Sequence, residues 1–330
     1  MKKIATLPEN DRRDLFQNVS QKMKTTPAVV EKDFWVCWIL DYLFRQSRLK
    51  NHLVFKGGTS LSKCYGLIDR FSEDVDLILD WRVLGYKTSE LWDEKSFSKQ
   101  NKLNHEIKKE SHLFLDKIQS DLEINLKNEL GDDIRCYIDQ TDADPAIRFA
   151  YPKSFSDKFI LPEIRLEISA LAAWTPSENI IISPYAADYY PDLFSQQNTK
   201  ILTAPCERTF WEKITILHRE AQRLDDSIPE RYSRHYYDIY CIASSDFKEK
   251  AMENIELLEK VAAFKEKFQP QSWAKYNEAK RGTLKLIPPE QNLKHLEKDY
   301  TQMQNMLFGE KPTFSEILET IKQLESEINH

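Results

Sequence analysis

Two aspartates lie two residues apart, a short distance after a pair of glycines. Asp74 and Asp76 belong to a segment in which residues alternate with a period of two, which is typical of a β-strand. At a rise of about 3.3 Å per residue, both side chains would leave the same face of that strand, with their Cα atoms about 6–7 Å apart. Neighbouring carboxylates without a cationic partner repel each other, and a divalent cation removes that cost. We therefore expect Asp74 and Asp76 to bind Mg²⁺ or Mn²⁺.

The glycine pair adds a second kind of chemistry. Gly57 and Gly58 follow an apolar run and lead into a helical segment that begins at Thr59. A glycine turn into a helix exposes backbone N–H groups and the positive end of the helix dipole, which together form a small anion site. The hydroxyl of Ser60 could donate to a terminal phosphate. A phosphate cradle beside two carboxylates is what Mg²⁺–NTP chemistry needs, because the metal bridges the acids and the triphosphate.

The order of the elements strengthens this interpretation. An Asp-x-Asp pair alone is most often a solvated strand end, and a lone Gly-Gly-Thr-Ser is equally unspecific. Here the segments 52–55, 57–58, 59–68 and 71–79 follow one another as strand, turn, helix and strand. The chain therefore predicts two motifs that one local fold could bring together.

The rest of the chain divides into two parts. Residues 1–50 read as helical, residues 86–131 as helices inserted between strands, and residues from about 200 onward as helical to the end. Further strands are expected at 134–138, 146–151, 164–168 and 180–183. We predict an α+β (mixed α/β) fold, with a first domain at 1–200 that carries the insertion near 86–131, and a helical domain at 201–330.

Composition limits the setting in which the protein works. A formal net charge of −6 weighs mildly against a general nucleic-acid binder, yet it leaves room for a local basic face. Five dispersed cysteines indicate free thiols in a reducing compartment, and they argue against structural zinc. No apolar stretch has the length of a membrane span or of a signal peptide. A cytoplasmic protein with no membrane partner is the expectation.

Several segments resemble one known family. Gly57–Ser60 together with residues 70–76 is similar to the first motif of the polymerase-beta-type nucleotidyltransferase superfamily, and more narrowly to that of the AbiEii/AbiGii toxins of bacterial toxin–antitoxin and abortive-infection systems. Segments 31–35, 208–213, 234–238, 299–303 and 312–314 also resemble this family. The resemblance covers nearly the whole chain, and it implies a nucleotidyltransferase-type mixed sheet flanked by helices.

The resemblance also implies roles for individual residues. Gly57, Gly58, Thr59 and Ser60 would bind the triphosphate of an NTP. A third carboxylate on a neighbouring strand commonly completes such a site as a metal ligand or general base, and Glu167 is the best match. The alternative is a solvent-facing glutamate on a one-sided strand.

Two residues of the helical part receive implied roles as well. Lys213 would be a ligand of the nucleotide phosphates or a stabiliser of their charge, and Asp238 would be a catalytic or acceptor-positioning acid. Asp238 could instead form an intrahelical pair with Arg234, which would stabilise the helix only slightly. Whether Glu167 or Asp238 acts as the general base is left open.

The resulting hypothesis is a metal-dependent nucleotidyltransferase toxin that transfers NMP from an NTP to an acceptor. The resemblance makes tRNA the expected acceptor, with a protein side chain as an alternative, and it implies a cognate antitoxin as partner. Two other functions are weighed against it. One is a non-catalytic nucleotide-binding module, and the other is a nucleotidyltransferase that modifies a small molecule such as an antibiotic. The sequence does not indicate which NTP is used.

Overall fold

A computed structural model describes residues 1–70, 74–132, 134–141, 144–158, 160–173, 175–225, 227–309 and 311–330 of the 330-residue chain, with the backbone alone at Thr88 and Asn305. The chain forms two compact units. The first comprises Met1–Cys64 and Ser72–Ala204, and the second comprises Tyr65–Phe71 and Pro205–His330.

The boundaries of the units differ from the prediction in one respect. The division after Ala204 lies close to the predicted boundary at 200, but the segment that begins at Tyr65 groups with the second unit. The helix expected at 59–68 is α4 (Gly57–Lys63), and it ends early. Gly66, just beyond it, has a φ of +61°, a left-handed conformation that does not continue a helix.

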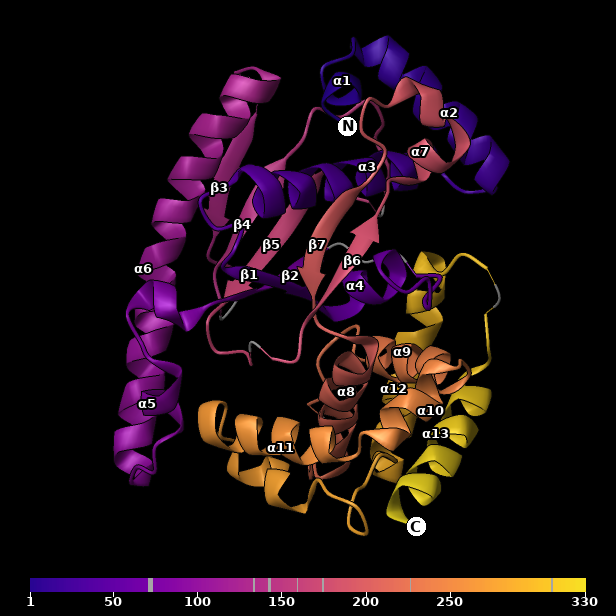
Figure 1. The fold of residues 1–330 in the computed structure, drawn as a ribbon. Helices are drawn as coiled ribbons and strands as arrows, with labels where there is room; N and C mark the ends of the chain where they lie inside the picture. Colours follow the sequence, from indigo (N-terminus) through magenta and orange to yellow (C-terminus); the bar gives the residue numbers. More distant parts are fainter. Residues whose placement is uncertain are drawn as a thin grey trace. The chain divides into compact units, whose positions relative to one another are not determined.

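The first unit contains a seven-stranded mixed sheet (Figure 1). Along the sheet the strands follow the order β3-β4-β5-β2-β1-β7-β6. β2 runs parallel to β5 and β1 parallel to β7, whereas the other neighbours are antiparallel. The strands are β1 (Leu53–Lys56), β2 (Asp74–Leu79), β3 (Arg135–Asp139), β4 (Ala146–Ala150), β5 (Glu163–Ser169), β6 (Glu178–Ile182) and β7 (Thr199–Thr203).

Alternating burial explains which strands the sequence predicted. In β5, Ile164, Leu166 and Ile168 are buried while the residues between them are not, which is the expected period of two. The sequence does not predict β7, because the chain reads as helical from about residue 200 onward. Its inward positions are Thr199, Ile201 and Thr203, so two of the three buried side chains are threonines. The strand therefore lacks an apolar alternation that the sequence could show.

Helices cover the sheet of the first unit. They are α1 (Lys2–Ala5), α2 (Glu9–Met23), α3 (Pro27–Asp41) with a π-helical turn (Tyr42–Gln46), α4, α5 (Thr88–Trp92), α6 (Phe97–Leu130) and α7 (Tyr185–Tyr189). α3 is buried from Ala28 to Asp41 and packs against β5 and β7, and α6 runs along β3, β4 and β5 (Figure 1). α5 and α6 are the predicted insertion.

Three consecutive charges of α3 are buried and bind other segments of the first unit. Glu31 accepts the backbone N–H of Ser154 at 2.6 Å, and Lys32 donates to the carbonyl of Leu161 at 3.1 Å. Asp33 forms an ion pair with Lys63 at 2.6 Å. Because a buried charge is tolerated only when it is paired or hydrogen-bonded, these contacts fix two loops and the end of α4 against α3. In this structure the segment 31–35, which resembles the family, therefore stabilises the fold of the first unit.

The second unit is helical, as predicted. Its helices are α8 (Cys206–Ala221), α9 (Ser233–Ala243), α10 (Phe247–Glu253), α11 (Glu256–Phe268), α12 (Glu290–Met303) and α13 (Phe314–Asn329). α8 packs against α9, α10 and α11, and α9 also packs against α12 and α13. α10 and α11 are two separate helices, since Asn254 between them leaves the helical conformation (φ −112°, ψ 53°). Across the described residues, no helix combines the length and the apolar character needed to cross a membrane.

Candidate active site

Three carboxylates share one face of the central sheet. β2 and β5 pair in parallel with Asp76 opposite Glu167 and Asp74 opposite Arg165. Paired residues on neighbouring strands, about 4.8 Å apart, direct their side chains to the same side of a sheet. Asp74 and Asp76 therefore project together with Glu167. The structure thus confirms that the two aspartates share one face and that Glu167 lies on the same face.

The carboxylate of Asp76 lies directly against the glycine turn. A β-carbon placed on Gly57 would be 1.9 Å from Asp76 Oδ2 and 2.8 Å from its Cγ. Gly57 also has a φ of +82°, which favours glycine. The position requires glycine on both counts. The sequence joined the two motifs by spacing alone, and the structure brings them into contact.

The first turn of α4 fixes this arrangement. The hydroxyl of Thr59 donates to the carbonyl of Asp74, which ties the helix to β2. Ser60 is completely buried, and its hydroxyl donates to the carbonyl of Gly57 at 2.8 Å. Gly58 is half-buried. Thr59 and Ser60 thus hold the turn in shape, and their predicted contacts with a triphosphate stay predictions.

The electrostatics of the three acids are unequal. Within the described part of the first unit, no basic side chain forms an ion pair with Asp74 or Asp76. Glu167, in contrast, pairs with Arg165 two residues earlier on the same strand. Asp74 and Asp76 are therefore the acids whose charge a cation from outside would balance.

The donor set suits a hard divalent cation. Mg²⁺ is commonly held by one or two carboxylates, together with substrate phosphates and water. Asp74 and Asp76 supply two such carboxylates from the same face of one strand, β2. Among the described residues, no three His, Cys, Asp or Glu side chains converge closely enough to hold a metal. Glu167 shares the face of the aspartates without completing a three-ligand cluster with them.

A second charged cluster lies inside the helical unit. Asp238 on α9 is fully buried and accepts Arg70 Nε at 2.6 Å and Nη2 at 2.8 Å, a bidentate pair. Lys213 on α8 approaches the same carboxylate at 2.8 Å. Asp238 thus binds Arg70 and Lys213, rather than forming the intrahelical pair with Arg234 that was weighed as an alternative.

This cluster sets the charge state of its members. Burial raises the pKa of Asp238, but the charges of Arg70 and Lys213 outweigh that effect and hold the pKa well below its usual range. Burial lowers the pKa of Lys213, and Asp238 opposes the decrease while Arg70 adds to it. His235, one turn before Ile239, has its pKa lowered well below normal by burial and by Lys213. The cluster is a firmly ionised carboxylate between two cations.

Arg70 is the member of this cluster for which the sequence analysis predicts no role. It lies in the first motif of the resemblance, but its partner Asp238 is 168 residues further along the chain. A charged residue beside other charged residues carries no sign of a partner at such a distance. Only its position at the start of the segment 70–76 could have drawn attention to it.

Comparison with known proteins decides the family. The model of the family described as "Nucleotidyl transferase AbiEii toxin, Type IV TA system" matches residues 38–320, which include Asp74, Asp76, Glu167, Lys213 and Asp238. The chain belongs to the AbiEii toxin family. It is thus a nucleotidyltransferase toxin of a type IV toxin–antitoxin system, and such a system implies an antitoxin partner. A search of the curated proteins found no match.

A solved structure shows the same fold as this AbiEii toxin. It is that of MenT4, a nucleotidyltransferase toxin of Mycobacterium tuberculosis H37Rv, with a TM-score of 0.52 and 16% sequence identity. The match covers 96% of this chain and 89% of the MenT4 chain. At this identity the likeness concerns the fold, and it confirms the mixed α+β architecture.

Proposed function

We propose that this AbiEii toxin transfers NMP from an NTP to an RNA acceptor, with tRNA as the substrate, and that Asp74 and Asp76 hold the Mg²⁺ that the reaction requires. In that reaction an acceptor hydroxyl bonds to the α-phosphorus and pyrophosphate leaves. The hydroxyl proton passes to a base. Mg²⁺ would offset the negative charge that develops on the phosphate oxygens.

One observation carries the proposal: the Asp76 carboxylate lies against the α-carbon of Gly57. This contact puts an acid without an ion-pair partner in its own unit beside the glycine turn of the family's first motif. Asp74, on the same face of β2, supplies the second acid. Backbone N–H groups of a glycine turn and a carboxylate-bound cation are complementary to a triphosphate.

The remaining residues receive roles that agree with their contacts. Lys213 would stabilise phosphate charge, as the resemblance implies. Asp238 would position Lys213. Its carboxylate already binds Arg70 and Lys213, and these two charges hold its pKa too low for it to accept a proton as a general base. Of the two acids considered as the general base, we therefore propose Glu167, which is 39% exposed and faces the same side as Asp76.

A labelling experiment tests the proposal. The purified toxin is incubated with each of the four α-³²P-labelled NTPs, Mg²⁺ and total tRNA, and the products are separated by size. We expect label to move to RNA with at least one NTP, and we expect Asp76→Asn to abolish the transfer. Asp192→Asn is the matched control, since it makes the same chemical change at an exposed residue of the first unit.

The outcomes separate the acceptors. Label on the toxin itself or on another protein would replace tRNA with a protein acceptor, and label on an added aminoglycoside would indicate a small-molecule acceptor. Equal transfer by Asp76→Asn and the wild-type toxin would remove Asp76 from the reaction. Addition of EDTA should stop the transfer, and excess Mg²⁺ should restore it.

A further inference from the structure

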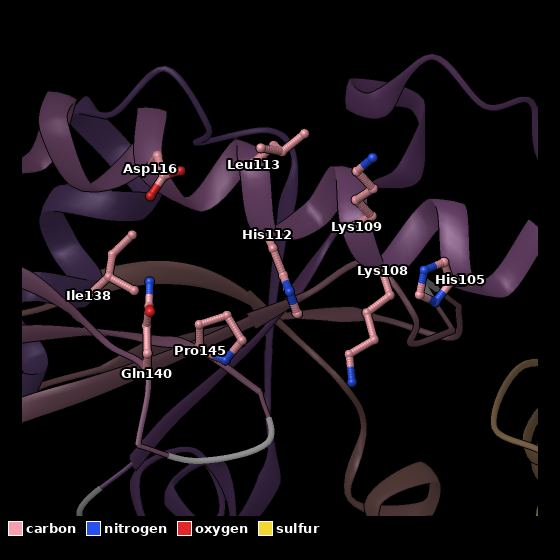
Figure 2. Close-up of a pocket in the computed structure, with 9 residues that line it drawn as sticks. All are labelled: His105, Lys108, Lys109, His112, Leu113, Asp116, Ile138, Gln140 and Pro145. Atoms are coloured by element: carbon pink, nitrogen blue, oxygen red, sulfur yellow. The ribbon is translucent and has the colours of Figure 1, made fainter.

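A cavity of about 500 Å³ opens between α6 and the β3–β4 hairpin, on the first unit. Its helical wall carries a basic set of four side chains, and Figure 2 shows two of them, Lys108 and His112, directed toward the hairpin. The hairpin contributes Ile138, Gln140 and Pro145. The basic set is His105, Lys108, Lys109 and His112.

The carboxylate of Asp144 already contacts this basic wall, which shows that the wall can bind an anion. Asp144, next to Pro145 on the hairpin, lies 2.6 Å from Lys108 Nζ and 3.9 Å from His112 Nε2. Lys108 and His112 are one helical turn apart, so both reach the same oxygen. Asp144 is 74% exposed and Lys108 43% exposed. An ion pair so exposed contributes little to stability, and another anion can displace it at little cost.

The remaining walls suit a nucleoside. Leu113, Ile138 and Pro145 supply apolar surface, and the amide of Gln140 can both donate and accept hydrogen bonds. The volume is within the range of pockets that hold small organic ligands. A phosphate near Lys108 and His112, with its base on the apolar surface, would use the basic and apolar parts of the cavity and leave Asp116, which also lines it, unoccupied.

We propose that this cavity binds a phosphate-bearing nucleotide of the RNA acceptor, with Lys108 and His112 taking the phosphate in place of the Asp144 carboxylate. The proposal rests on the proposed function, because it supplies a docking site for the acceptor that the reaction requires. Lys109 would add positive charge beside this site, where a neighbouring phosphate of the same strand would lie, and His105 could add a hydrogen bond. The same phosphate chemistry is offered by a free mononucleotide, which the experiment must distinguish.

Binding is measured apart from catalysis. A short fluorescein-labelled single-stranded RNA is titrated with full-length Asp76→Ala toxin without NTP, and fluorescence anisotropy is followed at several salt concentrations. We expect Lys108→Gln to weaken binding about threefold to tenfold and to lower the slope of log affinity against log salt by about 0.7, the value for one lost contact with a single-strand phosphate. Asp144→Asn should tighten binding, because it removes the internal competitor.

Lys127→Gln is the matched control. It removes the same charge from the same helix, 18 residues or about 27 Å beyond Lys109, and binding should not change. The opposite effects expected at Lys108 and Asp144 separate a binding role from loss of folding, which would weaken binding in both variants. If Lys108→Gln does not fold, the Asp144→Asn result decides alone.

Three results would overturn the proposal. The first is unchanged RNA binding in both variants, and the second is weaker RNA binding by Asp144→Asn. The third is that AMP competes with the RNA and binds with the same affinity, which would make the cavity a mononucleotide site. Photocrosslinking with 4-thiouridine RNA, mapped by mass spectrometry, should label the segments of α6 or the hairpin. Because binding is read without turnover, a failure of label transfer would affect the proposed function and leave this result standing.

Discussion

Asp76 and Gly57 form the tightest geometric relationship in the carboxylate site. The carboxylate occupies the space that a side chain at position 57 would need, with Oδ2 1.9 Å from the position of a β-carbon. The glycine is therefore required by the acid that faces it, in addition to its φ of +82°. Two short motifs, 19 residues apart in the chain, act as one unit.

Gly57→Ala should inactivate the toxin. The new methyl group must displace the Asp76 carboxylate, and a misplacement of about 1 Å at a reacting centre can reduce the rate about hundredfold. Label transfer to RNA measures the effect. Gly85→Ala is the control, because Gly85 is in the same unit, has a φ of +89° and has open space where its β-carbon would lie.

The two variants share backbone strain and differ in the contact with Asp76. Both should be destabilised by about 1 kcal/mol or more, since alanine at positive φ is strained, and urea denaturation measures this. Only Gly57→Ala should lose activity. Equal activity losses in the two variants would show that strain, and not the position of Asp76, is responsible.

The sequence was most informative where chemistry and periodicity coincide. The alternation of β2 predicted that Asp74 and Asp76 share one face, and the resemblance pointed to Glu167 on a neighbouring strand. The register of β2 and β5 places Glu167 opposite Asp76. Strand β7 was not predicted because threonines fill two of its inward positions. The predicted end of the helix at residue 68 is too late, because α4 ends at Lys63 and Gly66 has a left-handed conformation.

Contacts between distant segments were beyond the reach of the sequence. Arg70 and Asp238 are 168 residues apart, and nothing in the local pattern of either residue names the other. Lys213 lies on the apolar stripe of α8 and is only 6% exposed. A stripe shows that a charge needs a partner, but the fold alone decides which residue supplies it.

Lys213→Ala should reduce the rate of label transfer about 10²-fold to 10³-fold, the cost of removing a group that stabilises developing charge. Asp238 would keep its bidentate pair with Arg70, so the second unit should still fold. Lys260→Ala, at an exposed position of α11, is the control for loss of one positive charge. A full rate for Lys213→Ala would contradict the assigned role.

Asp238→Asn should destabilise the protein by about 3–5 kcal/mol, because it leaves the buried charges of Arg70 and Lys213 without a counter-charge. The midpoint of urea denaturation, followed by tryptophan fluorescence, measures the loss. Glu278→Gln removes one partner of an exposed pair with Lys275 in the same unit, and it should cost less than about 1 kcal/mol. A small effect at Asp238 would mean that water reaches the cluster.

The stability contributed by Asp238 should also depend on pH in a defined direction. Its pKa is lower in the folded protein than in the unfolded chain, so the contribution is complete above the unfolded value of about 4 and is lost as pH falls through the folded value. The wild-type protein should therefore lose stability in strong acid, and Asp238→Asn should lose less. Parallel acid profiles for the two proteins would contradict this.

His218 predicts a second pH effect, at milder acidity. Its Nδ1 accepts the backbone N–H of Lys285 at 3.1 Å, and Nε2 lies 3.1 Å from the carbonyl of Lys275, so the ring is held in its neutral form. Burial lowers the pKa of His218. Between the unfolded value of about 6.5 and the folded value, the unfolded chain binds a proton that the folded protein does not, and the free energy of unfolding must decrease as pH falls.

His218→Gln isolates this contribution. The variant should be less stable than the wild type at about pH 8, because it disturbs the two ring contacts at a cost of about 1–3 kcal/mol. Between about pH 7 and pH 5, however, its free energy of unfolding should decrease by less than that of the wild type, since one proton-linked group has been removed. The remaining decrease belongs in part to His235, whose pKa is also lowered by burial. If the wild type and His218→Gln lose stability equally over this range, His218 is protonated in the folded protein and the hydrogen bond from Lys285 is absent in solution.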